Sequence, residues 1–109
     1  MMTIEDIRQD RKSRRSQFVR AWHENSRFEH LLDSYCRCFQ TVGEIAELLR
    51  QSWCNKVKDD NGKSVWFDLL SRKDQYVVVN HFVADRSRWD CAIGSDDGRE
   101  VRVYRFVKG

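Results

Sequence analysis

The chain has 109 residues, of which 40% are hydrophobic and 34% are charged. This size and composition predict one folded domain and exclude a disordered chain, because the apolar residues are regularly spaced and numerous enough for a core. The net charge of +3 is too small to specify a polyanionic partner, and no apolar run approaches the ~18 residues of a membrane-spanning helix.

The first half of the sequence predicts three helices. Each opens with a serine or threonine followed three residues later by an acidic residue, which is the capping-box pattern or close to it. The pairs are Thr3 and Asp6, Ser26 and Glu29, and Thr41 and Glu44. The first helix is expected over residues 4–23. Apolar stripes at helical spacing define the core side of the second helix (Phe28, Leu31, Leu32, Tyr35, Phe39) and of the third (Val42, Ile45, Ala46, Leu49, Trp53).

The second half contains short β-branched and aromatic runs separated by turn residues. Strands are expected over residues 64–70, 75–84, 88–94 and 100–108, and a fifth over residues 53–58 if the Asn61-Gly62 hairpin closes. Strands joined by such short turns pair as an antiparallel meander. The predicted fold is therefore α+β, a single domain over residues 1–109. A helical layer (1–53) packs on a four- or five-stranded antiparallel sheet (54–109).

An alternative interpretation of the same half is a winged helix-turn-helix. Residues 64–70 and 73–86 would then form the two helices, and residues 88–108 the wing hairpin. The valine run at residues 77–79 favours the meander, because consecutive β-branched side chains lose rotamer freedom in a helix and suit a pleated sheet.

The first helix carries most of the sequence's functional signal. At about 100° per residue, its arginines at 11, 14 and 15 share a sector with Phe18 and Trp22. We expect a core-facing helix to avoid guanidinium groups there, so this face is predicted to meet a partner. Arginines beside aromatic rings suit nucleic-acid phosphates and bases, and they also suit an acidic protein groove. A solvated basic face is the third alternative. The candidate binding residues are Arg8, Arg11, Lys12, Arg14, Arg15, Phe18, Arg20 and Trp22.

A second candidate surface comes from the predicted sheet. Both strand faces carry apolar residues, and the helices are expected to cover one of them. The other face, with Phe82, Tyr104 and Phe106, is too apolar for water alone, which indicates a binding surface or a homodimer contact.

The cysteines give no metal signature. Cys36 and Cys38 are two residues apart, which puts their thiols on opposite sides of a helix. Cys54 and Cys91 lack the close second cysteine of structural zinc sites. We therefore expect neither a metal nor a cofactor. The N-terminal residues contain no hydrophobic signal segment, so a cytoplasmic protein with reduced cysteines and no membrane association is predicted.

One pair of residues offers nucleophilic chemistry. In the predicted meander His81 faces Cys91, and an imidazole beside a thiol is the arrangement of an activated nucleophile. The surrounding residues on that face are apolar, which favours simple packing. We therefore expect no catalytic residues and no enzymatic activity, and a thiol enzyme is the third functional hypothesis.

The leading hypothesis is a small non-enzymatic binding protein that regulates or inhibits a larger macromolecular machine, by analogy with accessory proteins of phages and mobile elements. The alternative is an RNA- or DNA-binding transcriptional regulator acting through the arginine-rich first helix. A protein partner is preferred over nucleic acid because the whole chain is only mildly basic.

Overall fold

The computed structural model of the protein describes residues 3–58 and 61–107. In these residues it contains four α-helices, two short 3₁₀ helices and two separate antiparallel two-stranded sheets, so the chain is of mixed α+β class. In chain order the elements are α1 (Ile4–His23), α2 (Ser26–Tyr35), α3 (Val42–Gln51), η1 (Trp53–Asn55), β1 (Lys56–Lys58), β2 (Ser64–Trp66), η2 (Phe67–Leu69), α4 (Arg72–Val83), β3 (Trp89–Asp96) and β4 (Arg99–Phe106). None of the helices in this part of the chain is both long and apolar enough to cross a membrane.

Two of the three predicted helix starts are confirmed. The Thr3 hydroxyl accepts a hydrogen bond from the Asp6 N–H, and the Asp6 carboxylate accepts one from the Thr3 N–H, which closes a capping box at the start of α1. Thr41 and Glu44 form the same reciprocal pair at the start of α3. These caps are local, so the sequence pattern alone specifies them.

α2 differs from the prediction at both ends. Its cap is Asn25, whose side chain accepts the Arg27 N–H, and Ser26 is the first helical residue. The helix ends at Tyr35, so the last two members of its predicted stripe, Tyr35 and Phe39, are exposed instead of buried. The chain then turns to run beside the end of β4, where Gln40 forms a bridge with Tyr104.

The predicted four-strand meander is wrong, because the segment expected as a strand at residues 75–84 is helix α4. The Ser71 side chain accepts the Asp74 N–H and so starts this helix. Val78, Val79 and Phe82 lie on one helical side and are buried in the core. Burial of that side outweighs the modest preference of valine for strands. The second helix and the wing hairpin of the winged helix-turn-helix alternative correspond to α4 and β3–β4. The first helix of that alternative is absent, because residues 64–70 form β2 and η2.

The two hairpins stay separate. β1 pairs with β2 from Lys56↔Trp66 to Lys58↔Ser64, so the predicted fifth strand is present only over its last three residues. Asp59 and Asp60 in its loop lie outside the described residues. β3 pairs with β4 along its whole length through the two-residue turn Asp97-Gly98. Both turn residues have left-handed φ, 50° and 78°, as a tight hairpin turn requires.

An aromatic cluster at the end of α1 organises the core. Trp22 stacks on Phe28 with ring centroids 5.0 Å apart, and its centroid lies 5.2 Å from that of Phe82. Phe18 contacts both Trp22 and Phe67. The exposed fraction is 0% for Phe18 and 2% for Trp22, so neither side chain lies on the partner-facing surface that was predicted to contain them. The C-terminal half of α1 is a core element, because these rings bury a large apolar area.

The second predicted surface is also corrected. Phe82, Tyr104 and Phe106 are buried, the first under α1 and α2 and the other two where the hairpin joins the helical body. These three side chains fill the core because residues 72–83 form helix α4. A strand in that segment would have left them on an open sheet face.

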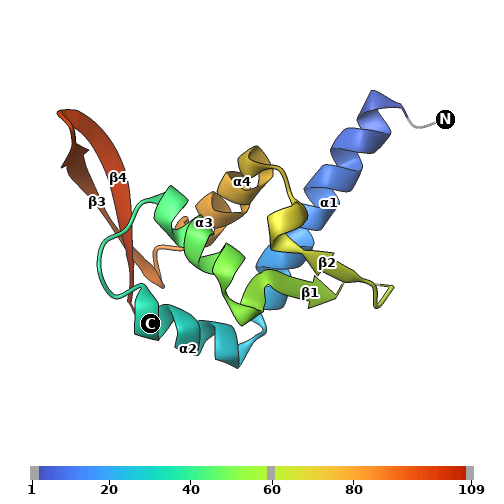
Figure 1. The fold of residues 1–109 in the computed structure, drawn as a ribbon, viewed down its shortest axis with the longest axis horizontal. Helices are drawn as coiled ribbons and strands as arrows, with labels where there is room; N and C mark the ends of the chain where they lie inside the picture. Colours follow the sequence, from blue (N-terminus) through green and yellow to red (C-terminus); the bar gives the residue numbers. More distant parts are fainter. Residues whose placement is uncertain (1–2, 59–60, 108–109) are drawn as a thin grey trace.

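The molecule is elongated, with principal extents of 47 × 32 × 24 Å. α4 contacts both α1 and α3 and lies between them (Figure 1). The β3–β4 hairpin projects from one end of the helical body, and the first turns of α1 extend from the other (Figure 1). α4 is therefore the central helix, and the hairpin follows it directly in the chain.

Candidate nucleic-acid interface

Two arginines of the predicted binding face point at α4. Arg11 donates from Nε to Oδ2 of Asp74 over 3.1 Å, and Arg15 donates from Nη1 to Oδ1 over 3.0 Å. The Asp74 side chain is only 6% exposed. The assumption that a helix facing the core cannot carry guanidinium groups in its stripe is therefore wrong here, because a buried carboxylate on the neighbouring helix neutralises them.

The charge state of Asp74 follows from this geometry. Burial alone would raise the pKa of the carboxyl, since it disfavours the charged form. The hydrogen bonds and positive charges of Arg11 and Arg15 act in the opposite direction and together hold the pKa below its usual value. Asp74 is thus ionised at neutral pH and fixes the position of Arg15 at the rim of a groove.

That groove, here called the basic groove, lies between α1 and α4. It has a volume of about 310 Å³ and is lined by Lys12, Arg15, Ser16, Val19, Arg20 and His81. Within the described part of the chain, none of its lining residues is acidic. Lys12 and Arg20 converge there with a hydroxyl and an imidazole, a combination of donors that suits a phosphate group, while the third cation, Arg15, is already paired with Asp74.

α4 presents a polar side to solvent beside this groove. Lys73, Tyr76 and Asn80 are exposed and share that side of the helix, which we call the α4 face. Tyr76 and Asn80 also line a depression of about 410 Å³ between α3, α4 and β4. Arg102 of β4 also lines this depression and, among the described residues, is the charged member of the lining. The α4 face thus has cationic groups on both flanks.

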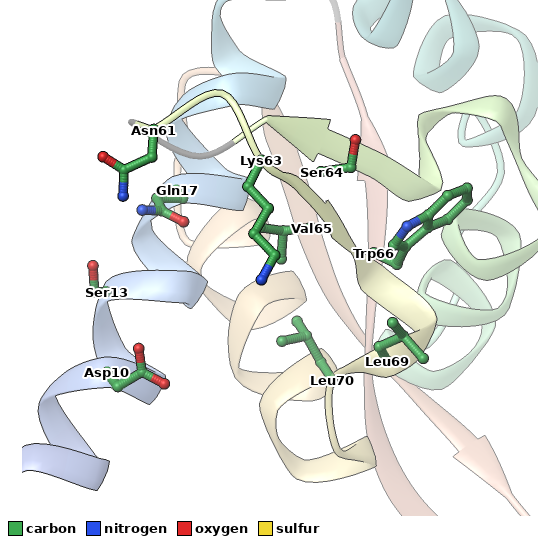
Figure 2. A pocket seen from close by; sticks show the side chains of 10 residues that line it. All are labelled: Asp10, Ser13, Gln17, Asn61, Lys63, Ser64, Val65, Trp66, Leu69 and Leu70. Atoms are coloured by element: carbon green, nitrogen blue, oxygen red, sulfur yellow. The ribbon is translucent and has the colours of Figure 1, made fainter. Parts of the chain in front are cut away.

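A different cavity lies on another side of α1. It has a volume of about 630 Å³ and separates α1 from the β1–β2 hairpin. Asp10, Ser13 and Gln17 of α1 face Lys63 and Val65 across it (Figure 2). Because it combines a carboxylate, an amine and neutral polar groups with an apolar floor, it lacks the uniform positive charge of the basic groove.

The remaining candidate residues are dispersed. Arg8 is exposed on the projecting part of α1, and the side chain of Arg14 lies outside the described part of the structure. His81 is on α4, whereas Cys91 is on β3 opposite Tyr104. The predicted His81–Cys91 pair therefore does not form, because it required residues 75–84 to be a strand.

The cysteines are also dispersed. Cys36 is buried at the end of α2, which raises the pKa of its thiol to about 12, while Cys38 and Cys91 are exposed. Among the described residues, no group of three or more cysteine, histidine or acidic side chains is placed to hold a metal ion.

Known proteins offer no guide to this site, since no family model, curated protein or solved structure matches the chain. Sequence reasoning missed the α4 face because the strand expected over residues 75–84 leaves Lys73 outside the element and puts Tyr76 and Asn80 on the same face as Phe82. The signal that could have found it is Ser71 followed by Asp74, a helix-start pattern directly before the valine run.

Proposed function

We propose that this protein is a non-enzymatic nucleic-acid-binding protein that neutralises backbone phosphates with the basic groove and the α4 face. The observation that carries the proposal is the convergence of Lys12 and Arg20 with His81, and with the Asp74-paired Arg15, in one groove whose described lining contains no acidic residue. Such a cluster recognises phosphate by charge and hydrogen bonding. A role as a transcriptional regulator fits binding of this kind.

The burial of two aromatic residues favours nucleic acid over the protein partner preferred from the sequence. An interface on α1 with a protein would depend on Phe18 and Trp22 as anchors, and both are in the core. Arg8, Lys12 and Arg20 remain exposed on that helix. Exposed cations without an exposed aromatic anchor beside them suit a phosphate backbone better than a protein groove.

The test is the salt dependence of binding to a fluorescent nucleic acid, measured by anisotropy. The slope of log K against log salt is negative, and each phosphate contact contributes about −0.7 to −0.9 to it. Lys12→Gln combined with Arg20→Gln is therefore expected to make the slope shallower by about 1.4–1.8. The matched control is Lys56→Gln combined with Lys58→Gln on β1, which removes the same charge from a strand that does not line the basic groove. Equal slopes for the two double variants, or no binding by the wild type, would refute the proposal.

A second candidate function is the regulation or inhibition of a larger machine through a protein contact. It is favoured by Trp53, which is 56% exposed, with the Arg27 guanidinium 5.8 Å from its ring centroid. Tryptophan and arginine are the residue types that dominate protein interfaces. In affinity purification after nuclease treatment, this function predicts a partner that wild type retains and Trp53→Ala loses. Retention by Trp53→Ala would exclude this surface.

A further inference from the structure

We infer that the nucleic acid is duplex DNA, with α4 in the major groove and the β3–β4 hairpin against the adjacent backbone. This inference rests on the proposed function and adds the kind of nucleic acid and the way it is read.

The first argument is the shape and support of α4. Val78, Val79 and Phe82 anchor one side in the core, between α1 and α3, while Tyr76 and Asn80 stand on the opposite side. A helix with side chains is about 10–12 Å across, and the major groove of B-form DNA is about 12 Å wide. A helix whose apolar side is fixed in the core and whose exposed side is polar has a shape that fits this groove.

The second argument is the placement of charge. The major groove runs between two phosphate backbones, so a helix inserted in it needs cations on both flanks. The basic groove supplies one flank, through Lys12 and Arg20, and Arg102 of β4 supplies the other. Three acidic residues of the hairpin, Asp96, Asp97 and Glu100, lie at or beside its turn, and the fourth, Asp90, pairs with Arg105. We therefore place the backbone contact at Arg102, nearer the helical body.

The third argument separates duplex DNA from other nucleic acids. Binding of single strands depends on several exposed rings on which bases stack. Among the described residues the exposed ring of the α4 face is Tyr76, because Tyr104 beside it is buried, and the other exposed rings, such as Trp53 and Trp66, lie on other elements. The major groove of duplex RNA is deep and narrow, which prevents side chains from reading it. A polar helix with cations on both sides is therefore complementary to the major groove of a DNA duplex.

The residue placed to read sequence is Asn80. Its side chain is exposed on the α4 face, beside Tyr76, and lines the same depression as Arg102. A side-chain amide donates to and accepts from the major-groove edge of adenine, N6 and N7, at the same time. We therefore expect a preferred DNA site in which one adenine is read by Asn80.

The experiment compares three labelled probes of one sequence: a DNA duplex, the RNA duplex and the single DNA strand. The sequence is first enriched from randomised DNA duplexes on the wild-type protein. We expect the DNA duplex to bind at least about tenfold more tightly than the other two. Equal binding of all three with the salt dependence intact would overturn the inference and leave the proposed function standing, whereas no binding to any would overturn both.

Two variants test the placement of the elements. Asn80→Ala should weaken binding to the enriched duplex about 5- to 150-fold, as expected for one bidentate base contact, and leave an unselected duplex bound as before. Arg102→Gln should make the slope of log K against log salt shallower by about 1 for both duplexes, because one phosphate contact is lost. Gln51→Ala at the far end of α3 is the matched amide control, and thermal melting confirms that each variant is folded. Unchanged binding by both Asn80→Ala and Arg102→Gln would refute this docking mode.

Discussion

At the scale of single residues, Asp74 explains how α1 packs with arginines in its apolar stripe. One buried carboxylate accepts hydrogen bonds from Arg11 and Arg15, and so converts two charges that would oppose packing into a link between α1 and α4. The same link positions Arg15 at the basic groove. Stability and the candidate site therefore share one residue.

Replacing Asp74 by asparagine tests this link. Asp74→Asn keeps the shape but removes the charge that two guanidinium groups contact, so we expect a loss of about 1–3 kcal/mol in the free energy of unfolding. Denaturant titration measures this loss. Asp68→Asn, at an exposed position on η2, is the matched control and should change stability by less than about 0.5 kcal/mol. Similar losses in the two variants would contradict the role assigned to Asp74.

The pH dependence of stability gives an independent readout of Asp74. Folding lowers the pKa of this carboxyl, so its stabilisation is complete above the unfolded value of about 4 and is lost as pH falls through the lower folded value. The difference in unfolding free energy between wild type and Asp74→Asn should therefore be constant near neutral pH and shrink in acid below about pH 4. A difference that grows in acid would have the wrong sign.

The thiols should differ in reactivity. Burial holds the pKa of Cys36 near 12, so its thiol stays protonated and shielded at pH 8, whereas Cys38 and Cys91 are exposed. Alkylation of the native protein followed by mass spectrometry should modify Cys38 and Cys91 first. Cys36 should react only after denaturant is added. Rapid labelling of Cys36 in the native protein would show that the end of α2 is open in solution.

At the scale of elements, the predicted core side of α3 is confirmed at Ile45, Ala46 and Leu49 but is wrong at Trp53, which lies beyond the helix in η1 and is 56% exposed. The segment after α2 also departs from its predicted stripe. Leu49 is 1% exposed, so its predicted burial is confirmed, whereas Phe39 is 42% exposed and its predicted burial is wrong. The Phe39 ring instead lies under the Arg105 guanidinium, 4.7 Å from ring centroid to Cζ. The helix that would have placed Phe39 in the core ends at Tyr35.

This difference predicts opposite results for two alanine variants. Leu49→Ala removes a fully buried side chain and should cost about 2–5 kcal/mol of unfolding free energy. Phe39→Ala removes an exposed cation–π contact and should cost no more than about 1 kcal/mol. Thermal or denaturant unfolding of both proteins measures the contrast. A larger loss for Phe39→Ala than for Leu49→Ala would mean that the layer formed by α2 and α3 is misplaced.

At the scale of the whole molecule, the two ends of the long axis are less supported than the centre. The side chains of residues 3–10 at the start of α1 are exposed, while most of α4 is packed against α1 and α3. Amide hydrogen exchange should therefore be fast in residues 4–10 and slow, close to global unfolding, in residues 78–83. Equal protection of both segments would contradict a projecting helix start and would point to a covering second copy of the chain.

Local sequence patterns were sufficient to predict the features that are held by neighbouring residues. The caps at Thr3 and Thr41 were predictable because each involves residues three positions apart. The α+β class and the last hairpin followed from patterns within one segment. The tight turn at Asp97-Gly98 also depends only on local backbone geometry.

The identity of α4 and the exposure of the candidate site depend instead on contacts between segments that are distant in the sequence. The valine run is compatible with strand or helix by local preference, and the burial of Val78 and Phe82 against distant helices selects the helix. Likewise, Arg11 and Asp74 are 63 residues apart in the sequence, so no local pattern reveals that they meet. Burial and ion pairing over such separations depend on the whole packed chain, which is why Phe18 and Trp22 lie in the core and the basic groove appears only between two folded helices.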